Sequence, residues 1–170
     1  TVTSPTGAKT TCLYTTNGLI KEEIYPDGTK SSIIYDVLSR PIRETKNGIT
    51  WEIAYDDPHH RVTRTNIATK SSEIREFDAR GNLIRLTDAA GYTSDKTYDS
   101  LNRIKTDTSP SGQQTVWSYQ GDTVICTLPN GEKQIQRYEG GRVAAFEAVN
   151  AQGHLLASSS YRYDPETDIQ

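Results

Sequence analysis

Short stretches rich in Ile, Val, Thr and Tyr alternate with turn signals along the chain, and polarity alternates within the stretches. In one of them Ile49, Trp51, Ile53 and Tyr55 fall on one side, with polar or small residues between them. The stretch 114–120 repeats this arrangement. A period of two residues indicates β-strands of about six residues with one face partly buried. No stretch keeps a helical period, so we predict an all-β chain with almost no helix.

An aromatic residue recurs about every 21 residues. The eight positions are Tyr14, Tyr35, Tyr55, Phe77, Tyr98, Tyr119, Tyr138 and Tyr163. The following residue is an aspartate at Asp36, Asp56, Asp78, Asp99 and Asp164, and Thr15, Gln120 or Glu139 elsewhere. Recurrence at such a short period is typical of a repeat architecture.

A glycine marks a second fixed position, seven residues before the next aromatic. It is present at Gly28, Gly48, Gly91, Gly112 and Gly131. The unit between Tyr55 and Phe77 carries Ala68-Thr69-Lys70 instead. Glycine takes positive φ without strain, and Asn-Gly or Asp-Gly suits a hairpin loop. A second turn follows the aromatic, as in "YDVLSRPI" and "FDARGNLI". We therefore predict that each repeat is two antiparallel strands joined to its neighbours by tight turns.

The aromatic and the acid have separate predicted roles. The aromatic is expected to form a ladder, stacking repeat upon repeat through cross-strand contacts of roughly 0.2 to 1 kcal/mol each. The acid is expected to accept hydrogen bonds from backbone amides of the turn that it starts. The ladder face becomes polar later in the chain, where Glu132, Gln134 and Gln136 share the face of Tyr138. Such a sheet buries one face incompletely.

Composition and charge narrow the class of protein. Hydrophobic residues are 34% of the 170, which argues against a thick core, and mean hydropathy is −0.69. The 19 basic and 22 acidic residues are spread along the chain, so no basic surface for nucleic acid is expected. No apolar run approaches the roughly 18 residues that span a bilayer, so this segment is not expected to insert into a membrane. The sequence contains no Met, and we expect it to begin inside a longer product.

Candidate chemistry is sparse. Only "DDPHHR" gathers residue types that ligate metals, but adjacent histidines on an extended chain point in opposite directions, which favours a solvated turn. His154 is expected at a surface turn. Cys12 and Cys126 fit no zinc spacing; two unpaired thiols are favoured, with a long-range disulfide as the alternative. There is no G-x-S-x-G elbow and no phosphate-binding loop. We predict no catalytic residue, no metal, no cofactor and no enzymatic activity.

The recurring sequence motif resembles that of a known repeat family. The repeat reads Tyr-Asp, two further residues, Gly or a substitute, Arg and an aliphatic residue, followed by "DAAGY" and another Tyr-Asp. This order of residues is similar to the YD repeat of the Rhs family. The best copy runs from Phe77 to Asp99, and "YDVLSRPI" and "YDSLNRI" are partial copies. The resemblance covers about residues 14–164, some eight repeats, so residues 1–170 are expected to form one repeat region within a much larger chain.

The resemblance implies a large β-sheet protein whose hairpins spiral into a hollow shell. In bacterial relatives the shell encloses a toxic C-terminal domain, as in Rhs polymorphic toxins and the B and C components of insecticidal toxin complexes; teneurins carry a related barrel. The implied partners are further YD repeats of the same or a partner chain and an enclosed toxin domain, and the implied location is secreted or bacterial cell-surface. The family's self-cleaving aspartate segment is not carried over, because "YDPETD" lacks the glycines that would follow it.

Eight repeats predict about 16 strands and, at roughly 4.8 Å per strand, a ribbon about 77 Å wide. Enclosing a domain of about 150 residues needs a wall of roughly twice that circumference, so this segment is expected to make half a turn. The alternative is a carbohydrate-binding or adhesive repeat module in which aromatics of adjacent hairpins hold a glycan. Such modules are dense in tryptophan, whereas this chain has only Trp51 and Trp117. A plain cell-surface spacer is a third interpretation.

Overall fold

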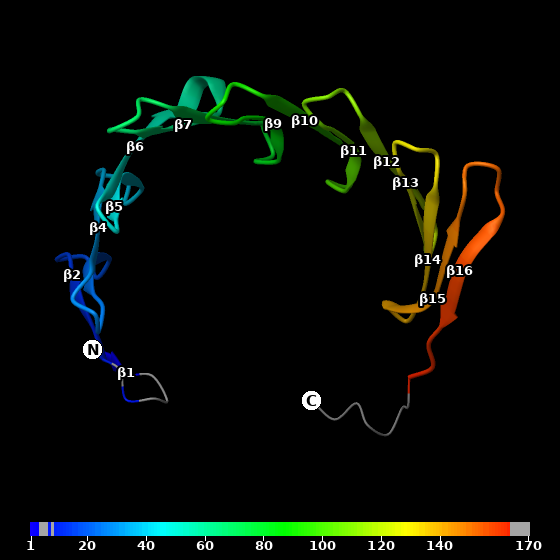
Figure 1. Cartoon of the computed structure of the whole chain (residues 1–170), viewed down its shortest axis with the longest axis horizontal. Helices are drawn as coiled ribbons and strands as arrows, with labels where there is room; N and C mark the ends of the chain where they lie inside the picture. Colours follow the sequence, from blue (N-terminus) through cyan, green and yellow to red (C-terminus); the bar gives the residue numbers. More distant parts are fainter. Residues whose placement is uncertain (4–6, 8, 164–170) are drawn as a thin grey trace. The chain divides into compact units, whose positions relative to one another are not determined.

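The computed structural model describes residues 1–3, 7 and 9–163, and these residues form an all-β chain (Figure 1). The chain divides into two units, Thr1–Tyr92 and Thr93–Gln170. Within each unit, strands that are neighbours in sequence are hydrogen-bonded neighbours in the sheet, and every pair is antiparallel. The described residues contain 16 strands, as predicted from consecutive hairpins.

The first unit contains nine strands and one short 3-10 helix. The strands are β1 (Val2–Thr3), β2 (Lys9–Tyr14), β3 (Ile20–Ile24), β4 (Lys30–Tyr35), β5 (Pro41–Lys46), β6 (Ile49–Asp56), β7 (Arg61–Asn66), β8 (Ser72–Phe77) and β9 (Leu83–Thr87). The helix η1 (Asp57–His59) lies in the turn between β6 and β7, and it is the only helix among the described residues.

The second unit contains seven strands. They are β10 (Thr93–Tyr98), β11 (Ile104–Thr108), β12 (Gln114–Gln120), β13 (Thr123–Thr127), β14 (Lys133–Glu139), β15 (Arg142–Val149) and β16 (Leu155–Ser160). Because successive strands are antiparallel, the connecting turns alternate between the two edges of each sheet. We call the edge with the turns that follow the repeat aromatics the aromatic edge, and the other the glycine edge.

Most turns share one backbone design. In the turn after β4, the N–H of Asp36 donates to the carbonyl of Arg40 at 2.9 Å, and the N–H of Ser39 donates to the carbonyl of Asp36 at 3.0 Å. Ser39, the last residue of the loop, has φ 64°. A type I turn closed by a residue in the left-handed region is a common three-residue hairpin loop. The five predicted turn glycines all have positive φ: Gly28, Gly48, Gly91, Gly112 and Gly131.

Lys70 occupies the position of the missing glycine. Its φ is 61°, so a non-glycine residue adopts the same left-handed conformation. The loop is also one residue longer, because the N–H of Asn66 donates to the carbonyl of Ser71 and the Oδ1 of Asn66 accepts from the N–H groups of Ala68 and Thr69. The extra residue accounts for the longer spacing of this repeat.

A β-bulge follows the turn at the aromatic edge. Tyr35 pairs with Pro41 but Ile34 pairs with Arg43, which leaves Ile42 as the extra residue. The same shift occurs after Phe77, Tyr98 and Tyr138, among others. A bulge adds one residue on one strand and increases the local twist. In the repeats that have the bulge, the shift places the aromatic and the first residue of the next strand opposite each other. The turns after Tyr55 and Tyr119 have no bulge.

The sheets have no conventional core. Among the described side chains no hydrophobic residue is buried, and the most buried polar residue is Ser31, at 9% exposure. In each unit the ribbons form a single layer (Figure 1). Most strand residues are half-buried, as in β7 and β13, because they pack only against neighbours in the same sheet. The thin core expected from composition is confirmed. Cys12 in the first unit and Cys126 in the second are both free thiols in this structure.

Candidate functional site

Three residues link each of several repeats to the next along the aromatic edge. We call this arrangement the clamp: an aspartate that starts the turn, the arginine four residues later, and the tyrosine of the following repeat. Two clamps are complete in the described residues, namely Asp36–Arg40–Tyr55 in the first unit and Asp99–Arg103–Tyr119 in the second.

The aspartate organises its own turn. Oδ1 of Asp36 accepts the N–H groups of Leu38 and Arg40, both at 2.9 Å, and Oδ2 accepts Nε of Arg40 at 2.8 Å. Asp99 makes the equivalent bonds at the same distances. The backbone amide of the residue four positions on holds the pKa of each carboxyl below its ordinary value, helped by the arginine side chain. The predicted role of these two acids is confirmed.

The arginine joins two repeats. The guanidinium of Arg40 lies 4.2 Å above the ring of Tyr55, and Nη1 of Arg40 is 2.7 Å from Oδ1 of Asp57 in the next turn. Arg103 lies 4.0 Å above the ring of Tyr119. A guanidinium over an aromatic face is attracted by the ring quadrupole. The aspartate fixes the arginine in place, so little rotamer freedom is lost when it covers the ring.

The tyrosine hydroxyl completes the link. Four repeat tyrosines donate a hydrogen bond from the side-chain hydroxyl to a backbone carbonyl near the start of an earlier strand. The pairs are Tyr35 to Ile20, Tyr55 to Pro41, Tyr119 to Ile104 and Tyr163 to Val143, at 2.8 to 2.9 Å. Burial raises the pKa of Tyr55 and of Tyr119. Each of these rings is therefore held at its edge by the backbone.

The ladder is built differently from the prediction. Successive aromatics belong to strands two apart in the sheet, a distance of roughly 10 Å that exceeds the range of direct ring stacking. At Tyr55 and Tyr119 the ring contact comes from arginine instead. Sequence reasoning noticed the arginine of the repeat but gave it no role. The role of this arginine could have been found from its spacing, because Arg40 and Arg103 both stand four residues after the aspartate.

Other repeats carry partial clamps. Asp78 accepts the N–H groups of Arg80 and Asn82, and Nδ2 of Asn82 takes the place of the arginine Nε at 2.9 Å. Thr15 starts its turn with a hydroxyl that accepts from the N–H of Leu19. Gln120 and Glu139 flank two-residue loops. Predicted ladder residue Tyr14 is 56% exposed, and Asp164 lies outside the described residues.

Asp56 does not cap its turn as predicted. It is still paired with Arg61 in the sheet, and its carboxylate contacts Nδ1 of His59 at 2.8 Å and the Arg61 guanidinium at 3.3 Å. The hydrogen bond with His59 lowers the pKa of Asp56. His59 is exposed and His60 has φ 49°, so the predicted solvated turn is confirmed here. The described residues contain no group of His, Cys, Asp and Glu that could hold a metal ion.

Acid and amide side chains also cap turns at the glycine edge, which sequence reasoning missed. Asp88 accepts the N–H groups of Ala90 and Tyr92, and Asn150 accepts those of Gln152 and His154. The signal was available, because "DAAGY" and "NAQGH" both begin with a residue that forms such Asx turns.

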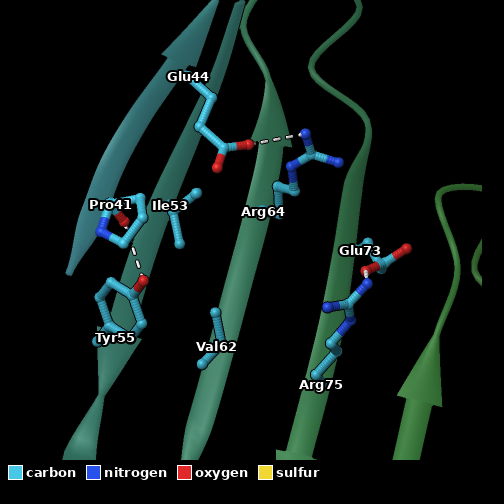
Figure 2. Close-up of a pocket in the computed structure, with 8 residues that line it drawn as sticks. All are labelled: Pro41, Glu44, Ile53, Tyr55, Val62, Arg64, Glu73 and Arg75. Carbon is cyan, nitrogen blue, oxygen red and sulfur yellow. Dashed lines mark hydrogen bonds and ion pairs between the residues drawn. The ribbon is translucent and has the colours of Figure 1, made fainter. Parts of the chain in front are cut away.

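A shallow cavity of about 350 Å³ lies on the face of Tyr55 in the first unit (Figure 2). Its floor includes Ile53 and Val62, and its charges are paired: Arg64 with Glu44 at 3.0 Å, and Arg75 with Glu73 at 2.7 Å. The guanidinium of Arg64 also lies 4.3 Å over the Trp51 ring. All four charged side chains that line the cavity are thus held in ion pairs.

The family model described as RHS Repeat matches residues 77–114, the segment that contains the best copy of the repeat. Residues 77–114 therefore carry an RHS repeat, in the segment where the sequence motif predicted one. No curated protein matches the sequence significantly. None of the residues that the structure describes forms a helix with the length and apolarity needed to cross a bilayer.

The fold of this chain is similar to parts of solved structures. The crystal structure of TcdB2-TccC3-Cdc42 matches with a TM-score of 0.52 and 14% identity, covering 88% of this chain and 11% of its own. The Photorhabdus luminescens Tc holotoxin pore matches with a TM-score of 0.29 and 14% identity, covering 92% and 13%. At this identity the first likeness concerns the fold alone. The present chain covers little more than a tenth of the length of the chains that it matches.

Proposed function

We propose that this Rhs-repeat chain is a structural wall segment of a shell that encloses a toxic cargo domain. The observation that carries the proposal is the clamp, which joins hairpin to hairpin in single-layer sheets that bury no hydrophobic core within the described residues. A protein that binds substrate in its interior needs a packed interior, whereas a wall needs only firm contacts between successive hairpins. The RHS repeat in residues 77–114 and the fold shared with TcdB2-TccC3-Cdc42 support the same role.

The proposed wall role implies particular partners and a particular location. The partners are further YD repeats of the same or another chain and an enclosed toxin domain, and the location is outside the bacterial cytoplasm, secreted or on the cell surface. The segment itself has no enzymatic role in this proposal. The polar strand that carries Gln134 and Gln136 on the face of Tyr138 is assigned to the lumen, where it gives cargo no apolar template. Replacing Glu132, Gln134 and Gln136 with leucine should slow cargo release.

Two experiments test the wall role. An antibody to this segment should detect a native product well above roughly 100 kDa on a denaturing gel, because enclosing a domain needs several times this length of ribbon. In that full-length protein, limited proteolysis should leave the cargo intact. The variant Arg103→Ala should expose the cargo to protease several-fold faster, while Lys105→Ala, an exposed residue on the next strand, should not. Equal cleavage of the cargo in wild type and in isolated cargo would refute enclosure.

Glycan binding is the alternative to the wall role. Arg64 lies 4.3 Å over one face of the Trp51 ring, so a sugar cannot stack on that face. If the segment is a wall, tryptophan fluorescence during titration with glycans should stay constant. A saturable change would favour the binding module over the wall.

A further inference from the structure

Asparagine is followed by glycine at three places in the chain, Asn17–Gly18, Asn47–Gly48 and Asn130–Gly131. This dipeptide is chemically reactive, because glycine has no side chain to hinder attack by its own backbone nitrogen on the preceding side-chain amide. All three pairs lie in turns between successive strands. The sequence therefore makes them equivalent, and only the structure distinguishes them.

Asn130–Gly131 is shielded by its turn. The backbone N–H of Gly131 donates to the carbonyl of Leu128 at 2.9 Å, and Oδ1 of Asn130 accepts the N–H of Glu132 at 3.1 Å. Gly131 is also half-buried. The nitrogen and the side-chain amide are each held by a separate hydrogen bond, so they can react with each other only after both bonds break.

Asn17–Gly18 is held in a similar way. The N–H of Gly18 donates to the carbonyl of Thr15 at 3.1 Å, and Oδ1 of Asn17 accepts the hydroxyl of Thr15. Nδ2 of Asn17 donates to Oγ of Ser39 at 3.3 Å. The side-chain amide is thus bound at its oxygen and at its nitrogen, which opposes its rotation toward Gly18.

Asn47–Gly48 lies in a different kind of turn. Lys46 pairs directly with Ile49, so Asn47 and Gly48 alone form a two-residue loop, with φ 51° and 76°. Positive φ at both residues is typical of a type I′ hairpin turn, which is closed by its flanking residues and not by its two central amides. Within the part of the chain that the structure describes, no hydrogen bond holds the N–H of Gly48 or the side chain of Asn47, and both residues are exposed.

We propose that Asn47 is a site of spontaneous deamidation. The backbone nitrogen of Gly48 gives up its proton to hydroxide and attacks Cγ of Asn47. The new N–C bond closes a five-membered succinimide, and the side-chain nitrogen leaves as ammonia after taking a proton from water. Water then opens the ring at Cγ to give aspartate, or at the main-chain carbonyl carbon to give isoaspartate. The net reaction consumes one water and releases one ammonia.

The modification changes both the charge and the backbone of the turn. Each product adds a carboxylate next to Lys46 at the glycine edge. Isoaspartate also routes the main chain through Cβ, which adds one atom to the backbone of the loop. A two-residue hairpin loop accepts few backbone conformations, so the longer backbone weakens the pairing of Lys46 with Ile49. Deamidation of Asn47 thus loosens the β5–β6 hairpin slowly and irreversibly, whether or not the segment encloses a cargo.

Peptide mapping of the aged chain tests the site. The chain is incubated in mildly alkaline buffer and digested at intervals, and mass spectrometry follows the replacement of each side-chain amide by a carboxyl group. We expect the peptide with Asn47 to convert several-fold faster than the peptides with Asn17 and Asn130. A parallel incubation in concentrated urea removes the turns, and the three rates should then become similar. Equal rates in the folded chain, or slower conversion at Asn47 than at Asn130, would overturn the proposal.

The variant Asn47→Gly is the matched control for the effect on the hairpin. Glycine accepts the positive φ of this position and has no amide to lose. After the same incubation, the urea midpoint of the wild-type chain should fall, whereas that of Asn47→Gly should stay at its starting value. An equal fall in both chains, or no fall in wild type after Asn47 has converted, would refute the loosening of the hairpin.

Discussion

Two turns of the first unit follow the same Tyr-Asp pair and are built differently. After Tyr35, Asp36 caps its turn through two backbone amides and holds Arg40. After Tyr55, Asp56 stays in the ladder of the sheet opposite Arg61, and the turn starts one residue later in a 3-10 helix. Identical letters at the start of a turn therefore produce a clamp in one place and an extended strand in the other.

The difference teaches that the clamp depends on spacing and not on the aspartate alone. At the first turn a left-handed residue stands three positions after the aspartate and arginine stands four after it. At the second, the left-handed residue is His60, four positions after Asp56. In the second turn, the carboxylate of Asp57 contacts Arg40 of the previous turn at 2.7 Å. The second turn is therefore bound by the clamp of the first turn but forms no clamp of its own.

The largest expected effect comes from removing the ring that a clamp holds. Tyr55→Ala deletes the Arg40 contact and the hydrogen bond to Pro41, so the free energy of unfolding in urea should fall by about 2 kcal/mol, less than for a fully buried ring. Tyr55→Phe removes only the hydroxyl and should cost about 1 kcal/mol.

Tyr14 provides the matched control for that ring. It is 56% exposed, and Tyr14→Ala should change the free energy of unfolding by less than about 0.5 kcal/mol. Equal losses at Tyr55 and Tyr14 would mean that the clamp contributes nothing beyond the ordinary strand position.

The turn residue with positive φ gives the second largest expected change in the free energy of unfolding. The change should have opposite signs at Gly91 and at Lys70. Gly91→Lys should destabilise the chain by about 1 kcal/mol, because φ at Gly91 is 87° and a side chain there is strained. Lys70→Gly relieves the same strain at φ 61° and should be stabilising by up to about 1 kcal/mol. Urea denaturation of both variants checks the sign; stabilisation by Gly91→Lys would contradict the turn assignment.

Neutralising the two aspartates tests the comparison directly. Asp99→Asn removes the charge that holds Arg103 in the clamp, whereas Asp56→Asn removes the charge that contacts His59 and Arg61 outside any clamp. We expect a lower urea midpoint for Asp99→Asn than for Asp56→Asn. The reverse order would show that the clamp turn is not the more important of the two.

The smallest effect per side chain should appear with acid. The pKa values of Asp36, Asp78 and Asp99 are lowered in the folded chain from the ordinary 3.8. A carboxyl with a depressed pKa stabilises the fold above its unfolded value and loses that contribution as pH falls through the folded value. The urea midpoint should therefore drop as the pH falls from about 5 through 3.8 and on toward the lower folded pKa values, and Asp99→Asn should reduce the drop. An unchanged midpoint would contradict these shifts.

The sequence carried most of the fold. Alternation in residues 49–55 and the glycine spacing predicted the hairpins, and the acid after Tyr35 and Tyr98 was correctly assigned to the turns. The partner of the ring was not predictable, because Arg40 and Tyr55 are 15 residues apart and meet only when two hairpins lie side by side. The failure at Asp56 has a local origin, because the turn starts at Asp57 in a 3-10 helix that contains Pro58 and Asp56 stays in strand β6.

What the sequence alone determined is local: where strands begin and end, which residues turn the chain, and how often the unit repeats, since these depend on φ preferences and a period of two. The tertiary structure decided which side chains meet across repeats. Those contacts depend on the spacing between strands and on the bulges that follow most turns of the aromatic edge. Neither is written in any single repeat, because each arises only when neighbouring hairpins pair.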